Sequence, residues 1–196
     1  MSPPPSAAAT RPTLKPVPAE YSDDERRLLL KLAHQSIEAL LDDREVDTTP
    51  PTPHLGEKRG AFTTLHLDGQ LRGCVGYVFP VHSLYQTVAE TAAAAAFRDI
   101  RFYPVTREEA PRLKIELSIL SPLRNILPGQ VEIGVHGLVI TEGPRRGLLL
   151  PQVPIEHGWD RETFLCQTCV KAGLAADAWK SGAVLECFTA EVFGEI

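Results

Sequence analysis

The chain has 196 residues, of which 43% are hydrophobic and 23% charged, and its formal net charge at pH 7 is -5. This length and composition are typical of one globular domain with a substantial core. The acidic balance provides no general attraction to nucleic acid or anionic lipid, so no DNA partner is expected. No segment reaches the roughly 18 consecutive apolar residues that a membrane span requires, so we also expect no membrane partner.

The N-terminal segment predicts a tail rather than part of the fold. Residues 1–20 contain six prolines, which disfavour helix and sheet alike. The segment also lacks the apolar region of a secretory signal. We therefore expect a disordered tail over 1–21 and a folded domain over 22–196. We also expect a cytoplasmic protein whose thiols stay reduced, at Cys74, Cys166, Cys169 and Cys187.

The first expected element is a helix from Ser22 to about Asp43. Ser22 and Glu25 have the spacing of a capping box, and apolar residues follow at helical intervals. The prolines of residues 47–53 then favour an extended connection, because each proline restricts the residue before it.

A β-hairpin is expected next, in AFTTLHL-DG-QLRGCVGYVF. Asp68 and Gly69 lie between two strand-like runs, and both residue types tolerate the positive φ angles of a tight turn. A two-residue loop would pair Leu67 with Gln70, Leu65 with Arg72 and Thr63 with Cys74. Because side chains alternate along a strand, Arg72 and Cys74 are expected to share a face.

The rest of the chain alternates helix and strand without a regular βαβ rhythm. We expect helices over 83–97 and 160–172, a strand over 113–119, a second hairpin over 136–153 and one closing strand over 183–193. Tight hairpins favour antiparallel pairing. The sequence therefore predicts an α+β fold of mainly antiparallel sheets with packed helices.

Cys74 is the most suggestive side chain. It lies between Gly73 and Gly76, close to Arg72, whose positive charge would stabilise a thiolate. Such a thiolate would be a nucleophile or a soft metal ligand. A small apolar residue that fills a tight core position is the alternative, and free cysteines are commonly buried in that way.

Glu116 and His136 are candidate proton carriers for the same chemistry. Glu116 lies on the strand face opposite the apolar row, and His136 lies beside a glycine-rich turn. A solvated strand carboxylate and a turn residue that satisfies the backbone are the respective alternatives. We expect no metal site, because Cys166-x-x-Cys169 lies well inside a helix and no second paired motif supplies further ligands.

Several arginines could contact an anionic substrate. Arg98 and Arg101 flank the loop that follows the second helix, and they are the best candidates for phosphate contacts. Charge balance against the 25 acidic residues is the alternative for most of the others.

Five segments, in this order, resemble one known family, the AMMECR domain, also described as AmmeMemoRadiSam system protein A. The segments are LRGCVG (Leu71–Gly76), AFRDIRF (Ala96–Phe102), IELSIL (Ile115–Leu120), HGLVI (His136–Ile140) and RRGLLLPQVPIEHGWDRETFL (Arg145–Leu165). The resemblance covers about residues 22–196. It implies two subdomains that flank a cleft. It also implies a site at the residues that match the family motifs, namely Arg72, Gly73, Cys74, Glu116, His136, Pro151 and Gln152.

The resemblance identifies no reaction and no cofactor, but it implies an association with a Memo-like protein and a radical-SAM protein. Two hypotheses follow. In the first, the protein is an enzyme or a substrate-handling subunit, with Cys74 as the nucleophile or acceptor thiol. In the second, it is a non-catalytic module that binds RNA, a nucleotide or another small molecule, or a partner protein.

Overall fold

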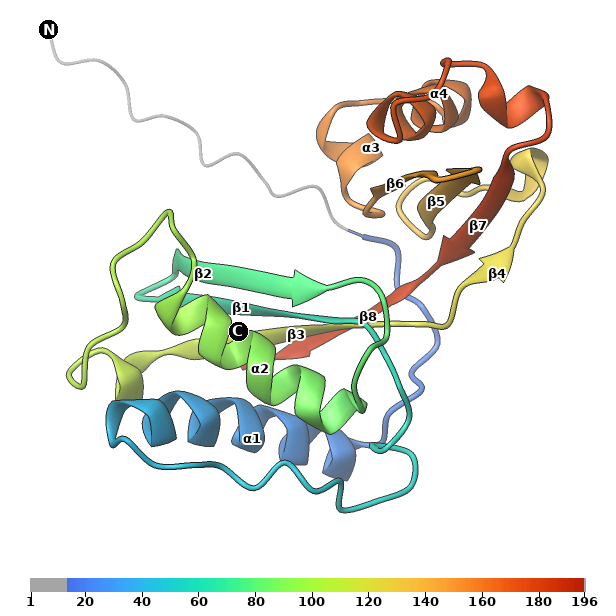
Figure 1. The fold of residues 1–196 in the computed structure, drawn as a ribbon. Coiled ribbons are helices and arrows are strands. Elements are labelled where there is room, and N and C mark those ends of the chain that lie inside the picture. Colours follow the sequence, from blue (N-terminus) through green and yellow to red (C-terminus); the bar gives the residue numbers. More distant parts are fainter. Residues whose placement is uncertain (1–13, 196) are drawn as a thin grey trace, which may run out of the picture. The chain divides into compact units, whose positions relative to one another are not determined.

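The computed structural model describes residues 14–195, which form two compact units (Figure 1). Among the described residues, the larger unit comprises 18–122 and 190–195, and the smaller unit comprises 14–17 and 123–189. Each unit contains one antiparallel four-stranded sheet with helices packed on it. The predicted α+β class with mainly antiparallel pairing is confirmed.

The larger unit is a four-stranded sheet covered on one face by two helices (Figure 1). The strand order is β2-β1-β3-β8. The strands are β1 (Ala61–Leu67), β2 (Gln70–Tyr77), β3 (Lys114–Leu120) and β8 (Ala190–Gly194), and the helices are α1 (Asp23–Leu41) and α2 (Leu84–Phe97). A short 3-10 turn, η1 (Ala110–Arg112), precedes β3.

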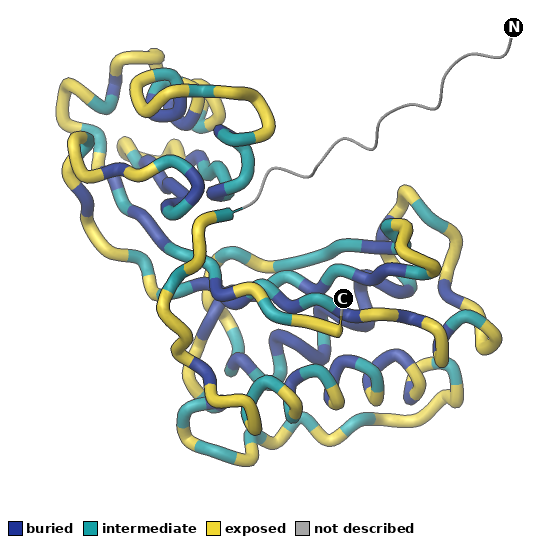
Figure 2. The backbone as a smooth tube through the Cα atoms, turned by 180° about the vertical axis from the view of Figure 1, so that it is seen from behind, coloured by how far each residue is buried: buried dark blue, intermediate teal, exposed yellow. Residues whose placement is uncertain are grey.

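Alternation along β1 and β3 separates the two faces of this sheet. Leu65, Ile115 and Leu117 are fully buried and join Leu29 and Val88 from the helices in one apolar core. Figure 2 shows buried positions recurring along the helices and along the strands that they cover. The residues between them in each strand belong to the opposite face, which the helices do not cover.

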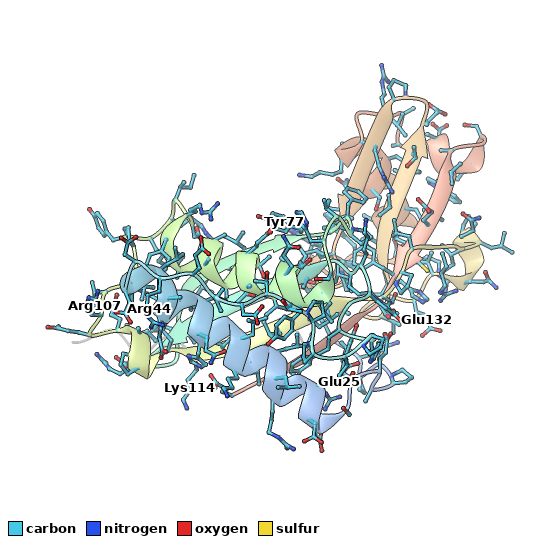
Figure 3. The ribbon with its side chains drawn as sticks, turned by 60° about the horizontal axis from the view of Figure 1, so that its bottom comes forward. Glu25, Arg44, Tyr77, Arg107, Lys114 and Glu132 are labelled. Atoms are coloured by element: carbon cyan, nitrogen blue, oxygen red, sulfur yellow. The ribbon has the colours of Figure 1, made fainter. Side chains whose placement is uncertain are left out.

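Polar side chains form hydrogen bonds and ion pairs at both ends of α1. At its start, Ser22 Oγ accepts the Glu25 N–H, and the Glu25 carboxylate accepts the Ser22 N–H at 3.0 Å, so the predicted capping box is confirmed. At its end, Asp42 pairs with Arg44 at 2.7 Å and with Arg107. Figure 3 labels Glu25 at the first end and Arg44 and Arg107 together at the other.

The β1–β2 hairpin turns at Asp68 and Gly69, as predicted, and both residues have positive φ. Leu67 pairs with Gln70 as expected, but a β-bulge between Leu65 and His66 shifts the register beyond that point. Leu65 therefore pairs with Gly73, and Thr64 rather than Thr63 pairs with Cys74. The predicted register was wrong there, because a bulge inserts one extra residue and interrupts strict alternation.

Helix α2 lies unusually close to β2. A Cβ atom on Gly73 would lie 2.1 Å from the Ala95 carbonyl oxygen. The alanine run at residues 92–96 supplies small side chains on the helix, and Gly73 supplies none on the strand. The glycine before Cys74 is thus required by the packing of the helix.

The smaller unit has the strand order β4-β7-β5-β6. Its strands are β4 (Arg124–Asn125), β5 (Gly137–Glu142), β6 (Arg145–Leu149) and β7 (Val184–Phe188); its helices are α3 (Val153–Glu156) and α4 (Arg161–Lys171), with 3-10 turns η2 (Pro128–Gln130) and η3 (Ala178–Lys180). Helix α4 packs on β5 and β6. Phe164 and Cys169 from α4 meet Leu138, Ile140 and Cys187 in a second apolar core.

The closing segment differs from its prediction. It forms two strands that join different sheets: β7 belongs to the smaller unit, and β8 belongs to the larger one. Alternation continues through both strands, and periodicity alone does not reveal which sheet a strand joins. The expectation of one closing strand was therefore wrong.

The fold begins before Ser22. Of the predicted tail, residues 1–13 lie outside the described residues. Tyr21 is buried, and the N–H groups of Glu20 and Tyr21 donate to the Glu191 carboxylate. No helix within residues 14–195 is long and apolar enough to cross a membrane.

Candidate active site

Cys74 lies on β2 and is partly buried. The hydroxyl group of Thr64, its partner on β1, donates to Cys74 Sγ at 3.2 Å. The neighbouring strand residues Thr63 and Leu65 are buried on the side of the helices. Thr64 and Cys74 therefore belong to the opposite face of the sheet, and the thiol is not sealed in the apolar core.

Glu116 lies on the same face as this pair. It pairs with Thr64 from the other side, so Cys74, Thr64 and Glu116 form one row across β2, β1 and β3. Neighbouring strands are about 4.8 Å apart, which puts the Cα atoms of Cys74 and Glu116 roughly 10 Å apart. A thiol and a carboxylate can both reach one small ligand across that separation.

Asp99 holds the loop that follows α2 against β2. Its carboxylate accepts the Cys74 N–H at 2.9 Å and the Arg101 N–H at 3.2 Å. The Arg101 guanidinium binds the same carboxylate through Nε at 2.9 Å and Nη2 at 2.6 Å. Hydrogen bonds from Arg101 hold the pKa of Asp99 far below its usual range, although burial acts in the opposite direction.

Arg101 is the arginine bound to the Cys74 segment. Its Nη2 also donates to the Cys74 carbonyl oxygen at 3.3 Å. Arg72, the arginine expected to stabilise the thiolate, instead donates twice to the Glu109 carboxylate, at 3.0 Å from both Nε and Nη2. The pKa of Glu109 is lowered, mainly by these hydrogen bonds. Arg72 therefore ties β2 to the segment before β3.

The loop after α2 presents large side chains to solvent. Ile100 is 100% exposed and Tyr103 is 90% exposed, and Arg98 is exposed beside them. Backbone hydrogen bonds hold this loop, from Phe102 N–H to the Asp99 oxygen and from Val105 N–H to the Ala96 oxygen. These side chains therefore project from a fixed segment.

His136 belongs to the smaller unit, where it is buried. The Glu132 N–H donates to its Nδ1 at 3.0 Å, and Arg124 Nη2 lies 3.2 Å from its Nε2. Burial, assisted by the charge of Arg124, lowers the pKa of His136. The imidazole thus closes the turn that precedes β5.

Of the expected site residues, Arg72, Gly73, Cys74, Arg98, Arg101 and Glu116 all belong to the larger unit, where hydrogen bonds join Arg101 to the Cys74 segment and Glu116 lies in the same cross-strand row as Cys74. His136, Pro151 and Gln152 belong to the smaller unit, where Pro151 and Gln152 directly precede α3. Sequence reasoning missed Thr64, Asp99 and Glu109. Asp99 carried a signal, because an acidic residue between Arg98 and Arg101 is a natural partner for either guanidinium.

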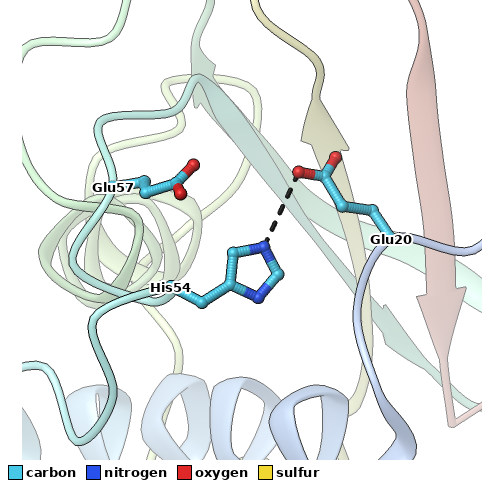
Figure 4. A group of neighbouring side chains, drawn as sticks. All are labelled: Glu20, His54 and Glu57. Carbon is cyan, nitrogen blue, oxygen red and sulfur yellow. Dashed lines mark ion pairs between the residues drawn. The ribbon is translucent and has the colours of Figure 1, made fainter.

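A second polar cluster, formed by Glu20, His54 and Glu57, has potential metal ligand atoms within 4.8 Å of one another (Figure 4). Arg59 Nη2 binds Glu20 at 2.5 Å and Glu57 at 2.8 Å. His54 Nδ1 binds Glu25 at 2.8 Å. The guanidinium of Arg59 already neutralises the two carboxylates, so these residues form an ion-pair network that does not suit a metal cation.

The sequence profile of the AMMECR1 family matches residues 30–193. The chain belongs to the AMMECR1 family. A Methanosarcina acetivorans protein is 44% identical over 186 residues, which cover 89% of this chain and 93% of that protein. A Methanopyrus kandleri protein is 40% identical and covers 88% and 89%. The crystal structure of the uncharacterized protein PH0010 from Pyrococcus horikoshii has a TM-score of 0.74 and 38% identity, covering 90% and 94%.

These AMMECR1 relatives match the chain along nearly its full length. The expected family and the α+β fold are confirmed together, because one relative with a solved structure shares both sequence and architecture.

Proposed function

We propose that this AMMECR1 protein is an enzyme, or the substrate-handling subunit of one, in which Cys74 is the nucleophile or acceptor thiol. The observation that carries the proposal is the row of Cys74, Thr64 and Glu116 on the sheet face that α1 and α2 do not cover. The Thr64 hydroxyl donates to Cys74 Sγ at 3.2 Å, which holds the sulfur on the face where Glu116 also lies.

Glu116 is the proposed proton carrier. In the proposed step, the thiol proton passes to the Glu116 carboxylate through a water molecule or the substrate. Sulfur then forms a bond to an electrophilic carbon, whose bond to the leaving group breaks, and Glu116 returns the proton to that group. His136 suits this role less well, because its Nδ1 accepts a backbone hydrogen bond and its ring is buried.

The proposed partners are a Memo-like protein and a radical-SAM protein, as the AMMECR resemblance implies. They would supply or consume the molecule that Cys74 handles. Cys74 suits the covalent attachment of such a molecule, because its strand β2 is held in place by both α2 and the Asp99 loop.

The rate of Cys74 alkylation tests the proposal. We expect iodoacetamide to modify Cys74 in the folded protein at pH 7 at least as fast as in the urea-unfolded chain, measured by mass spectrometry of the Cys74 peptide. A merely structural thiol that is partly buried should react more slowly when folded. Thr64→Val should slow the folded-state reaction, because it removes the hydroxyl that donates to sulfur.

Ser118→Ala is the matched control, because Ser118 lies on the same strand face as Glu116, two residues along β3. It should leave the rate unchanged. A folded-state rate well below that of the unfolded chain would contradict the proposal.

A binding module is the second candidate function, favoured by the exposure of Ile100 and Tyr103 beside Arg98. In that case RNA, a nucleotide or a partner protein would bind this loop. Cys74→Ser would then leave binding intact, whereas Tyr103→Ala or Arg98→Ala would weaken it. Equilibrium titration of these variants separates the two functions.

A further inference from the structure

We propose that the molecule handled at Cys74 carries a carboxylate or phosphate group, which binds Nη1 of the Arg101 guanidinium with help from Arg98. This inference rests on the proposed function of Cys74, because it names the chemical class of the substrate at that site.

Arg101 is fixed through Nε and Nη2, and its two remaining N–H donors are both on Nη1. Its Nε and Nη2 atoms bind the two Asp99 oxygens, and Nη2 also binds the Cys74 carbonyl oxygen. Within residues 14–195, its Nη1 atom has no hydrogen-bond acceptor, and the side chain is 54% exposed. A guanidinium has five N–H donors in a planar fork, so the remaining donors are already oriented for an oxyanion.

These contacts hold the guanidinium of Arg101 against the backbone of Cys74. Asp99 binds both the Cys74 N–H and the Arg101 side chain, so one buried carboxylate sets the relation between the thiol and the guanidinium. An arginine whose side chain is ordered in advance loses little conformational entropy when it binds a ligand.

The surrounding charges determine how an acidic substrate would be oriented in the site. Asp99 occupies only Nε and Nη2 of Arg101, and Glu109 occupies Arg72, whereas the exposed Arg98 supplies the additional positive charge that attracts an anion to the loop. Glu116 lies across Thr64 from Cys74 and repels anions. A substrate with one acidic group is thus favoured with that group toward Arg101 and its reactive carbon toward the sulfur.

Two alkylating reagents that differ mainly in charge test the inference. Iodoacetate carries a carboxylate, and iodoacetamide carries a neutral amide; in both reactions sulfur forms a bond to the CH₂ carbon and iodide leaves. We expect the ratio of the iodoacetate rate to the iodoacetamide rate at Cys74 to be about tenfold higher in the folded protein than in the unfolded chain. A tenfold change corresponds to one charge-assisted hydrogen bond.

Three variants locate the effect. Arg101→Gln should return the ratio to its unfolded value, and Arg98→Gln, which leaves the Asp99 contacts intact, should lower it about two- to threefold. Arg112→Gln is the matched control, because Arg112 is similarly exposed at 56% and pairs with Asp68 in the same unit. It should not change the ratio. Inorganic phosphate and acetate, added separately, should slow alkylation of the wild type but not of Arg101→Gln, and the stronger of the two identifies the preferred acidic group.

The outcomes separate this inference from the function on which it rests. Rapid reaction with iodoacetamide, together with a charge ratio equal to that of the unfolded chain, overturns the anion site and leaves the thiol proposal standing. An elevated ratio that persists in Arg101→Gln also overturns it. If folding slows the reaction of Cys74 with both reagents, the proposed function itself fails.

Discussion

Two cysteines of the smaller unit, Cys169 and Cys187, contrast with Cys74 of the larger unit, whereas Cys166 is partly buried like Cys74. In the smaller unit, Cys169 and Cys187 are fully buried in the apolar core, and burial raises the pKa of both thiols. In the larger unit, Cys74 lies outside the core, beside a hydroxyl group, an arginine and a buried carboxylate. The same residue type thus fills space in one unit and is a candidate reactive group in the other.

This contrast shows why a cysteine is interpreted through its neighbours. Nothing in the flanking sequence of Cys187 distinguishes a core residue from a reactive one. The difference is created by the face of the sheet to which each side chain belongs, together with the loop that packs against it.

The largest expected effect is a difference in alkylation rate between the cysteines, which tests directly whether their environments differ. In the native protein, Cys169 and Cys187 should react with iodoacetamide at least about a hundredfold more slowly than Cys74, because their modification requires local unfolding. Mass spectrometry of each cysteine peptide over time measures the rates. Labelling of Cys187 as fast as Cys74 would mean that the two environments are equivalent.

Gly73→Ala tests the contact that holds β2 beneath α2. The added Cβ would lie 2.1 Å from the Ala95 carbonyl oxygen, so helix and strand must separate. We expect the free energy of unfolding to fall by about 3 kcal/mol, measured by urea denaturation.

Gly129→Ala is the control for that substitution, because nothing lies within 4 Å of a Cβ atom at Gly129. It should change stability by no more than about 0.5 kcal/mol. Equal effects of the two substitutions would show that the close approach at Gly73 is not what matters.

Asp99→Asn tests the carboxylate that orders the Cys74 loop. The carboxylate side chain is 6% exposed and binds two N–H groups and one guanidinium, so its loss should lower the free energy of unfolding by about 2 kcal/mol at pH 7. The pKa of Asp99 is depressed when the protein is folded. Its stabilising contribution is therefore present above the unfolded pKa of about 3.9 and is lost as pH falls further.

The difference between wild type and Asp99→Asn should shrink as pH falls below about 4, measured by thermal or urea unfolding across that range. A difference that stays constant with pH would assign the effect to packing rather than to charge. The same variant should reduce the Cys74 iodoacetate preference.

Local signals in the sequence predicted most elements of this fold. The Ser22–Glu25 capping box, the Asp68–Gly69 turn and the start of a helix at Asp160 each depend on residues a few positions apart, and each was confirmed. The bulge opposite Leu65 and the change of sheet at Thr189 were not predicted, because both depend on which distant strand becomes a neighbour.

The features of the candidate site likewise fall into those that the local sequence predicts and those that depend on tertiary contacts. The motif around Cys74 and the position of Glu116 on the polar face of its strand could be found in the sequence. The partnership of Arg72 with Glu109 and of Asp99 with the Cys74 N–H could not, since each joins segments that only the tertiary fold brings together.

The smallest expected change in the free energy of unfolding is that of a substitution at His54, which lies in the same unit as Cys74. Its ring stacks on Tyr21 with centroids 4.7 Å apart, and its nitrogens face Glu25 at 2.8 Å and Glu20 at 3.6 Å. Burial opposes the charged form, but these carboxylates prevail and raise the pKa of His54. A raised folded pKa stabilises the protein fully below the unfolded pKa of about 6.5, and the stabilisation is lost as pH rises through the folded pKa.

His54→Gln should therefore lower the free energy of unfolding by about 0.5 kcal/mol at pH 6, and by less at pH 9, measured by urea denaturation. His82→Gln is the control, because the His82 ring is more exposed, at 41% against 31%, and lies 3.8 Å from Glu90. It should have little effect at either pH. If His54→Gln lowers the free energy of unfolding equally at pH 6 and pH 9, the ring acts through its stack on Tyr21. The carboxylates of Glu20, Glu25 and Glu57 would then stabilise the fold through Arg59 and the helix cap rather than through the imidazolium.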